Sequence, residues 1–271
     1  MKVKAKRISG RAGWAAALVA AGLALAPVAH AGRACEGQPP SVRSVEQGLA
    51  LAQRTAQALD ASGARLVVLA RAGQDLRRYG QHYSHLGLAY RNEQGHWRVL
   101  HKLNACGTAV AALYRQGLAE FFLDDLWRHE AAWAVPQPEV QARLLVLLTD
   151  PARATALHAA PYSMVSYAWG RRYQQSNQWV LETLAAAMEP SIRTREQAQA
   201  WLQFKDYQPA VLTLGPLTRL GARVGSAHIA FDDHPGEKRF ADRIETVSAD
   251  SVFAWLPRAG LAAAPVALRL Q

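Results

Sequence analysis

The segment from residue 64 to residue 103 constrains the fold more than any other part of the chain. Residues 64–70 (ARLVVLA) are a short apolar run bounded by glycine and polar residues, which predicts a buried strand. Residues 83–90 (YSHLGLAY) and 97–103 (WRVLHKL) flank a turn at residues 92–95 (NEQG). Two β-type runs joined by such a turn indicate an antiparallel hairpin. We therefore expect a small antiparallel sheet in this part of the chain.

Helices with one apolar face are expected around this sheet. Apolar residues recur every three or four positions from Val45 to Leu59, and Ser44 with Gln47 resembles a capping box at the start of that helix. The other helices expected are residues 108–127, 139–148, 176–186 and one that begins near Thr194, and the short strands expected in the tail are residues 210–214, 227–231, 243–247 and 251–255.

No internal repeat, low-complexity tract or long Pro/Gly/Ser linker divides the chain after residue 31. We therefore predict a single α+β domain over residues 32–271, with a helical insertion at about residues 108–160. Residues from about 210 to 271 form a C-terminal extension that either completes the sheet or covers a cleft.

The first 31 residues have the composition of an export signal. Five Lys and Arg residues precede an apolar run at residues 14–28, and Ala29-His30-Ala31 matches a cleavage site. We predict a signal peptide that ends near Ala31 and a periplasmic or secreted protein, because the apolar run is short for a membrane span. Removal of the signal lowers the net charge from +10 to +5. That charge does not indicate nucleic acid, and it suits an anionic envelope polymer or a membrane surface.

Two cysteines, Cys35 and Cys106, remain after the predicted cleavage site. In an exported protein they are expected to form one disulfide that ties the N-terminus to the domain. Two free thiols are the alternative. In that case Cys106 would lie just before a predicted helix start, where the helix dipole lowers the pKa of a thiol.

No metal or cofactor site is predicted from the motifs. His129-Glu130 begins like the zinc motif H-E-x-x-H, but Trp133 occupies the place of the second histidine. His228 and His234 flank two aspartates without a spacing that is diagnostic of metal ligands.

Three residues are candidates for chemistry: His85, His101 and Ser176. The two histidines lie on the paired strands of the predicted hairpin, so one could act as a base while the other holds its tautomer. Each could equally be a hydrogen-bonded core residue. On local rules Ser176 is an N-cap, which accepts a hydrogen bond from a free amide of the first turn. A helix start is also a place where exposed amides stabilise an anionic nucleophile or an oxyanion.

The sequence resembles two known families. The hairpin with SHLG and the later helix start QSNQWV resemble permuted NlpC-type, papain-like proteins, the group that includes lecithin retinol acyltransferase. In that group a histidine of the form Thr/Ser-His-Val/Leu-Gly precedes a nucleophile that follows much later, in Asn-Cys-x-x-Phe-Val. The whole mature chain also resembles an exported bacterial family, domain of unknown function 2145, through SHLGLAYR, LNACG, FFLDDL, YQQSNQW and AFDDHP.

The resemblance to the papain-like group implies its fold and a site in which His85 is the general base, His101 orients it and Ser176 stands where the group has a cysteine. It implies a hydrolase or acyltransferase that acts on an amide or ester of an envelope component, such as a peptidoglycan peptide or a lipid. Because a serine hydroxyl has a far higher pKa than a thiol, the same site also suits an inactive binding or scaffolding protein. The residues expected to contribute to binding are Asn177 and Gln178 as donors to an oxyanion, and Tyr83, Tyr173, Trp169 and Trp179 as the lining of the cleft.

Overall fold

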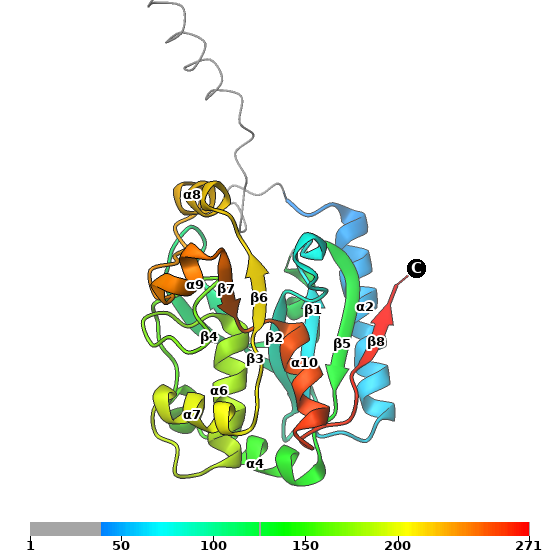
Figure 1. The fold of residues 1–271 in the computed structure, drawn as a ribbon. Helices are drawn as coiled ribbons and strands as arrows, with labels where there is room; N and C mark the ends of the chain where they lie inside the picture. Colours follow the sequence, from blue (N-terminus) through cyan, green and yellow to red (C-terminus); the bar gives the residue numbers. More distant parts are fainter. Residues whose placement is uncertain (1–38, 125, 271) are drawn as a thin grey trace, which may run out of the picture.

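A six-stranded antiparallel sheet forms the centre of the computed structural model, which describes residues 39–124 and 126–270. Its strands lie in the order β4-β3-β2-β1-β5-β8 (Figure 1). The predicted signal peptide and Cys35 lie outside the described residues. The strands are β1 (Leu66–Ala72), β2 (His85–Arg91), β3 (Trp97–Asn104), β4 (Ala111–Gly117), β5 (Arg128–Ala134) and β8 (Val266–Arg269).

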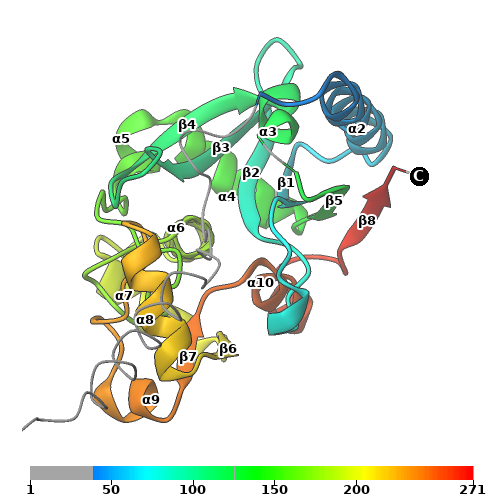
Figure 2. The ribbon, with the colours of Figure 1, turned by 90° about the horizontal axis from the view of Figure 1, so that it is seen from above.

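Helices cover both faces of this sheet (Figure 2), so the expected α+β architecture is confirmed. One face carries α2 and α3, and the other carries α4, α6, α7 and α10. The helices are α2 (Val42–Ala61), α3 (Leu118–Leu123), α4 (Pro138–Thr149), α5 (Pro151–Thr155), α6 (Ser176–Met188), α7 (Arg195–Phe204) and α10 (Ala249–Arg258), and a 3-10 turn spans Arg77–Tyr79.

Capping side chains fix several helix starts. The Ser41 hydroxyl accepts a hydrogen bond from the Ser44 N–H, so α2 begins slightly earlier than the sequence pattern indicated. Thr194 and Gln197 form the reciprocal capping box that was expected at the start of α7. These local bonds satisfy amides that have no partner within the helix, and they set where each helix begins.

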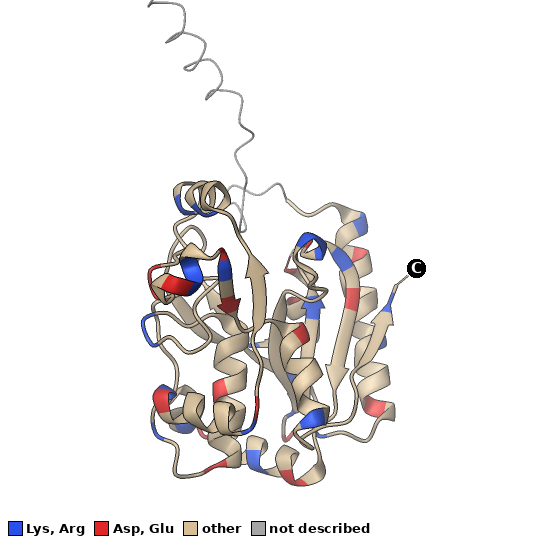
Figure 3. Cartoon of the chain, in the orientation of Figure 1, with Lys and Arg blue, Asp and Glu red and all other residues tan. Residues whose placement is uncertain are grey.

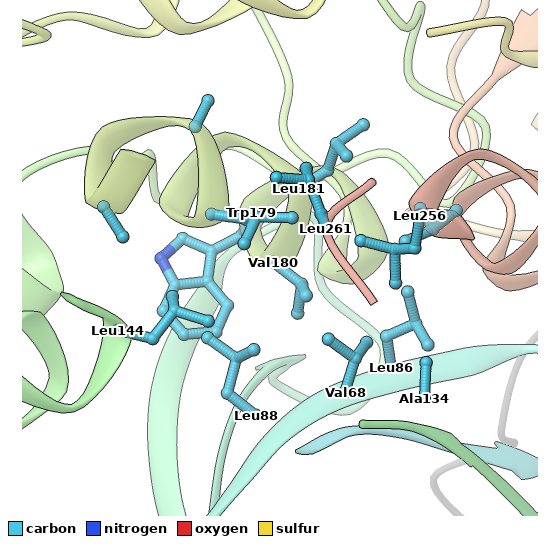
Figure 4. Close-up of a cluster of buried hydrophobic side chains, with 14 of the residues drawn as sticks. Val68, Leu86, Leu88, Ala134, Leu144, Trp179, Val180, Leu181, Leu256 and Leu261 are labelled. Carbon is cyan, nitrogen blue, oxygen red and sulfur yellow. The ribbon is translucent and has the colours of Figure 1, made fainter. Parts of the chain in front are cut away.

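The larger hydrophobic core lies between the sheet and the helices α4, α6 and α10. Figure 4 shows Trp179 and Val180 of α6 directed toward Leu88 of β2 and Val68 of β1. Trp179 is fully buried there. The second core, on the opposite face, packs α2 and α3 against the alternate residues of the same strands. The sheet therefore buries both faces, and for this reason β1 is buried at every position.

A small lobe, residues 210–246, stands beside the main sheet (Figures 1 and 2). It contains the antiparallel strands β6 (Ala210–Thr213) and β7 (Arg243–Thr246) and the helices α8 (Pro216–Gly225) and α9 (Gly236–Phe240). Its own core consists of five buried apolar residues, namely Leu212, Leu214, Ile229, Phe231 and Ile244.

The expectation of a helix over residues 108–127 was wrong. Residues Ala111–Gly117 form β4, which pairs with β3 from Asn104–Ala111 to Arg98–Gly117, and only Leu118–Leu123 is helical. The apolar residues have helical spacing, but pairing with the free edge of β3 overrides that local preference. The expected helical insertion therefore contributes sheet strands as well as helices.

β5 also comes from this region, and the sequence pattern did not indicate it. Its segment RHEAAWA holds three alanines and no β-branched residue, so it lacks the composition typical of a strand. It nevertheless lies between β1 and β8, with Ala131 and Ala132 buried on opposite faces. Small side chains suit a strand that helices or loops approach closely on both sides.

The tail completes the sheet, which was one of the two expected roles. β8 pairs with β5 at the edge, and β6 and β7 confirm the strands expected at residues 210–214 and 243–247. The strand expected at residues 251–255 was wrong, because that segment lies within α10 and buries Val252, Trp255 and Leu256 at helical spacing. Residues 227–231 form no strand.

A buried ion pair joins α6 to α7. The Glu182 carboxylate is fully buried and lies 2.8 Å from Arg195 Nε. It also accepts hydrogen bonds from the side-chain amides of Gln174 and Gln199, at 2.6 and 2.8 Å. All its strong acceptor positions thus face donors, as a buried charge requires.

We predict that Glu182→Gln destabilises the protein by about 3–5 kcal/mol, because it leaves the mostly buried Arg195 guanidinium without a counter-charge. The same substitution at Glu139, in an exposed pair with Arg143, is expected to cost less than about 1 kcal/mol. Urea unfolding at neutral pH measures both values. Equal losses for the two variants would contradict the buried network.

Candidate active site

A row of polar side chains crosses four neighbouring strands on the face covered by α3. Arg71 on β1 pairs in register with His85 on β2, and His101 on β3 and Gln116 on β4 continue the row. Phe121 of α3 covers it, with its ring 5.9 Å from the His85 ring and 5.2 Å from the His101 ring. The hairpin thus brings the two predicted histidines together.

The histidines form a hydrogen-bonded relay. His85 Nε2 lies 2.9 Å from His101 Nδ1, and His101 Nε2 lies 2.7 Å from Gln116 Oε1. In this amide orientation Gln116 Oε1 accepts, so His101 Nε2 carries a proton. A neutral His101 then has a bare Nδ1, to which His85 Nε2–H donates. The remaining nitrogen of His85, Nδ1, is therefore unprotonated and can accept a proton.

Burial keeps both imidazoles neutral. Loss of solvation and then the nearby Arg71 guanidinium lower the pKa of His101 to about 4, although the hydrogen bond to Gln116 and the Asp124 charge act in the opposite direction. The pKa of His85 also lies well below its ordinary value, first because the ring is buried and then because Arg71 and His101 are close. Both rings are therefore neutral at pH 7, as the relay requires.

Arg71 supplies this positive charge from a fixed position. Its guanidinium donates to the Phe121 carbonyl and to the Asp124 carboxylate, and it stacks over the Phe121 ring at 4.8 Å. These contacts tie β1 to α3 and hold Phe121 over the histidines.

The start of α6 meets the sheet beside His85. The β2–β3 ladder reaches only as far as Leu88–Leu100, and the Leu86 N–H donates instead to Asn177 Oδ1, at 2.8 Å. Asn177 therefore occupies the opening between β2 and β3. The body of α6 packs on the face opposite to the histidine rings, and Asn177 in its first turn bonds to the residue that follows His85.

Gly87 is required at this point. A Cβ on Gly87 would lie 2.5 Å from Val99 Cγ1 and 3.2 Å from His101 Cβ. Absence of a side chain at residue 87 lets β3 approach β2 closely enough for His101 to meet His85.

Ser176 is the first residue of α6, and the cap is its neighbour Gln175. Gln175 Oε1 accepts from the Asn177 N–H at 2.7 Å, so the expectation that Ser176 caps the helix was wrong. Ser176 is buried beside Tyr162, whose pKa is raised to about 12 by burial, an effect that a hydrogen bond with Ser176 partly offsets. Within residues 39–124 and 126–270, no hydrogen bond joins Ser176 to His85.

Two main-chain amides at this helix start are buried and have no hydrogen-bond acceptor among the described residues. Across the described part of the chain, no acceptor contacts the main-chain N–H groups of Ser176 and Gln178. They belong to the first turn, where the helix dipole favours negative charge.

The side-chain amides of Asn177 and Gln178 have structural partners. Asn177 Nδ2 donates to the Val247 carbonyl at 3.3 Å, and Gln178 Nε2 donates to the Ala168 carbonyl at 3.1 Å. Both residues hold the helix start in place, and neither side-chain donor is directed at an open position.

The four aromatic residues expected to line a cleft do not gather in one place. Trp179 belongs to the main core, and Tyr83 donates from its hydroxyl to Glu130 Oε1 at 2.8 Å. Trp169 packs edge-on against Tyr207 and lines a surface cavity of about 360 Å³ near the small lobe. Tyr173 lies next to Asp232, and the pKa of its hydroxyl is raised first by burial and then by that carboxylate.

Sequence reasoning missed Arg71, Gln116 and Phe121. The charged Arg71 directly after an apolar strand (ARLVVLAR) was an available signal, because a cation at the end of a buried strand needs a partner. Gln116 carried no signal, since residues 111–117 had a helical pattern. Cys106 is described and Cys35 is not, so their pairing stays a prediction.

Within residues 39–124 and 126–270, no three His, Cys, Asp or Glu side chains gather as metal ligands would. No helix in the same part of the chain is long and apolar enough to cross a bilayer.

We predict that the buried relay makes the protein lose stability as the pH falls from about 6.5 to about 4. The folded-state pKa of His101 is depressed, so the unfolded chain binds a proton in this window that the folded chain does not. A depression from 6.5 to about 4 corresponds to about 3 kcal/mol.

Urea unfolding at a series of pH values measures this loss. His101→Gln should flatten the dependence, whereas the matched change at the exposed His96 should leave it unchanged. If the stability of His101→Gln depends on pH as strongly as that of the wild type, the dependence arises from other groups.

Comparison with known proteins assigns the chain to a family. No curated protein and no solved structure matches it. The sequence profile of DUF2145, described as an uncharacterized protein conserved in bacteria, matches residues 58–256. That range contains the relay, the start of α6 and the small lobe. The chain belongs to the DUF2145 family.

Proposed function

We propose that the protein is a papain-like hydrolase or acyltransferase in which His85 is the general base and Ser176 the nucleophile. One observation carries the proposal. The relay Gln116–His101–His85 fixes a neutral His85 whose Nδ1 is left without a proton. A base held in one tautomer by a second polar residue is the arrangement that activates a serine or cysteine.

The proposed reaction begins with attack of Ser176 Oγ on an amide or ester carbonyl. The serine proton passes to His85 Nδ1, and the carbonyl oxygen becomes an oxyanion. The unpaired main-chain N–H groups of Ser176 and Gln178 are the donors proposed to stabilise it. Collapse of the intermediate breaks the bond to the leaving amine or alcohol, which takes the proton from His85. Water or an acceptor hydroxyl then releases the acyl group from Ser176 in the reverse sequence.

The reaction requires Ser176 Oγ and His85 Nδ1 to come within about 2.6–3.2 Å of each other. Catalytic hydrogen bonds are often longer in ligand-free enzymes and shorten when the substrate binds. Asn177 fixes the helix start to Leu86, the residue after His85, and the proposed reaction requires the first turn of α6 to bring Ser176 to the His85 ring.

The proposed substrate is an amide or ester of the bacterial envelope, such as a peptidoglycan peptide or a lipid. Support comes from the predicted signal peptide, which lies outside the described residues, and from the resemblance to permuted papain-like proteins.

A binding or scaffolding protein without catalysis is the second candidate. Its support is the burial of Ser176 and His85 together with the absence of a hydrogen bond between them in the described chain. In that case the relay is a buried polar network that specifies how α3, β2 and β3 pack.

We predict that a fluorophosphonate probe labels the folded protein at Ser176. Ser176→Ala should abolish labelling, and His85→Ala should slow it by about 10²–10⁴-fold, the usual contribution of a general base. Labelling detected by mass spectrometry gives both the site and the rate.

Ser191→Ala is the matched control, because Ser191 is an exposed serine and its loss should leave labelling unchanged. Circular dichroism confirms that each variant is folded. Failure of the folded wild type to label favours the binding protein over the enzyme.

A further inference from the structure

Helix α8 of the small lobe presents its apolar side to solvent. Leu217, Leu220 and Val224 are spaced by three and four residues, so they share one face. Their exposed fractions are 84%, 60% and 81%. No residue of α8 is buried. In an ordinary surface helix such an apolar stripe faces the hydrophobic core of the protein.

The opposite side of α8 makes the contacts with the lobe. Arg219 and Ala222 are half-buried there, and Ala222 packs against the five-residue core of the lobe. Arg219 donates to the Leu214 carbonyl and to the Asp242 carboxylate. The helix is thus fixed through its more polar side, and its apolar stripe is held outward by specific bonds.

The charge of α8 points to one class of partner. The helix contains Arg219 and Arg223 and no acidic residue, and Figure 3 shows blue and no red along it. Arg223 is exposed and has no acidic partner among the residues that the structure describes. Apolar side chains beside an unneutralised cation suit a surface that is apolar inside and anionic outside.

We propose that α8 docks the protein on an anionic phospholipid membrane, with Leu217, Leu220 and Val224 inserted at the level of the acyl chains and Arg223 against lipid phosphates. A short helix with an apolar stripe and arginines lies in the interface plane in this manner. Phe240 of α9, which is 76% exposed beneath the Arg239 guanidinium, repeats the pairing of an apolar group with a cation in the same lobe.

A second copy of the chain suits this face poorly. Two α8 helices packed through this stripe would bring the exposed Arg223 of each copy toward the other, without an acidic residue of either α8 between them. Three side chains from each partner also fall short of the roughly 1,000 Å² that a specific protein interface buries. The proposal is independent of the chemistry at Ser176, because α8 contains none of the proposed catalytic residues.

The test is sedimentation with lipid vesicles of phosphatidylcholine alone or mixed with phosphatidylglycerol, at low ionic strength. The protein is produced from its full sequence, and mass spectrometry identifies its N-terminus so that only variants with the same N-terminus are compared. We expect clear binding to the phosphatidylglycerol vesicles and its decrease with added salt.

Leu217→Ser/Leu220→Ser/Val224→Ser should lower the partition coefficient by about ten-fold or more. Arg223→Glu should lower binding to phosphatidylglycerol vesicles by at least about five-fold and leave binding to phosphatidylcholine unchanged. Val146→Ser/Phe204→Ser, which removes exposed apolar groups elsewhere, is the matched control and should bind like the wild type.

Three results would overturn the proposal. They are absence of wild-type binding to phosphatidylglycerol vesicles, equal binding by the triple serine variant, and a wild-type dimer in gel filtration that the triple variant loses. The last result would assign the face to a second copy of the chain.

Discussion

The hydrogen bond from the Leu86 N–H to Asn177 Oδ1 is the contact on which the candidate site depends. It ends the β2–β3 ladder and inserts the first turn of α6 at the level of the sheet. The first turn of α6 could not lie beside His85 if β3 continued to pair with β2. Buried donors must find acceptors, so the opening of the ladder and the position of the helix require each other. Gln175 and Gln178 reinforce the position through bonds to main-chain groups.

Burial determines the protonation state of the two relay histidines. An exposed histidine is partly protonated near neutral pH, but His85 and His101 lie beneath Phe121 and next to Arg71. Both effects disfavour a second positive charge, and the Gln116 oxygen then decides which nitrogen of each ring carries the proton. The same burial limits access, so the proposed catalysis would require the helix start to shift when a substrate binds.

The parts of the fold that could be predicted were those with strong local signals. The apolar runs of β1, β2 and β3 and the capping box of α7 are local signals, because each depends on only a few neighbouring residues. The hairpin that these runs predict brings His85 next to His101. β4 and β5 could not be predicted because their strand state depends on partners that are distant in sequence. Gln116 was not predicted as part of the site, because the strand that carries it, β4, was not predicted. Ser176 was predicted as a cap because serine is a good one, and Gln175 performs that role because its longer side chain reaches the Asn177 amide.

The central claim is that His85 is neutral and carries its proton on Nε2, which leaves Nδ1 as the base. Nitrogen-15 NMR of the histidine side chains at pH 7 reads the tautomer of each ring directly. Nε2–H tautomers are predicted for both His85 and His101, with a shift in the His101 signals in Gln116→Leu. An Nδ1–H tautomer or a protonated ring at His85 would contradict the relay and remove the proposed base.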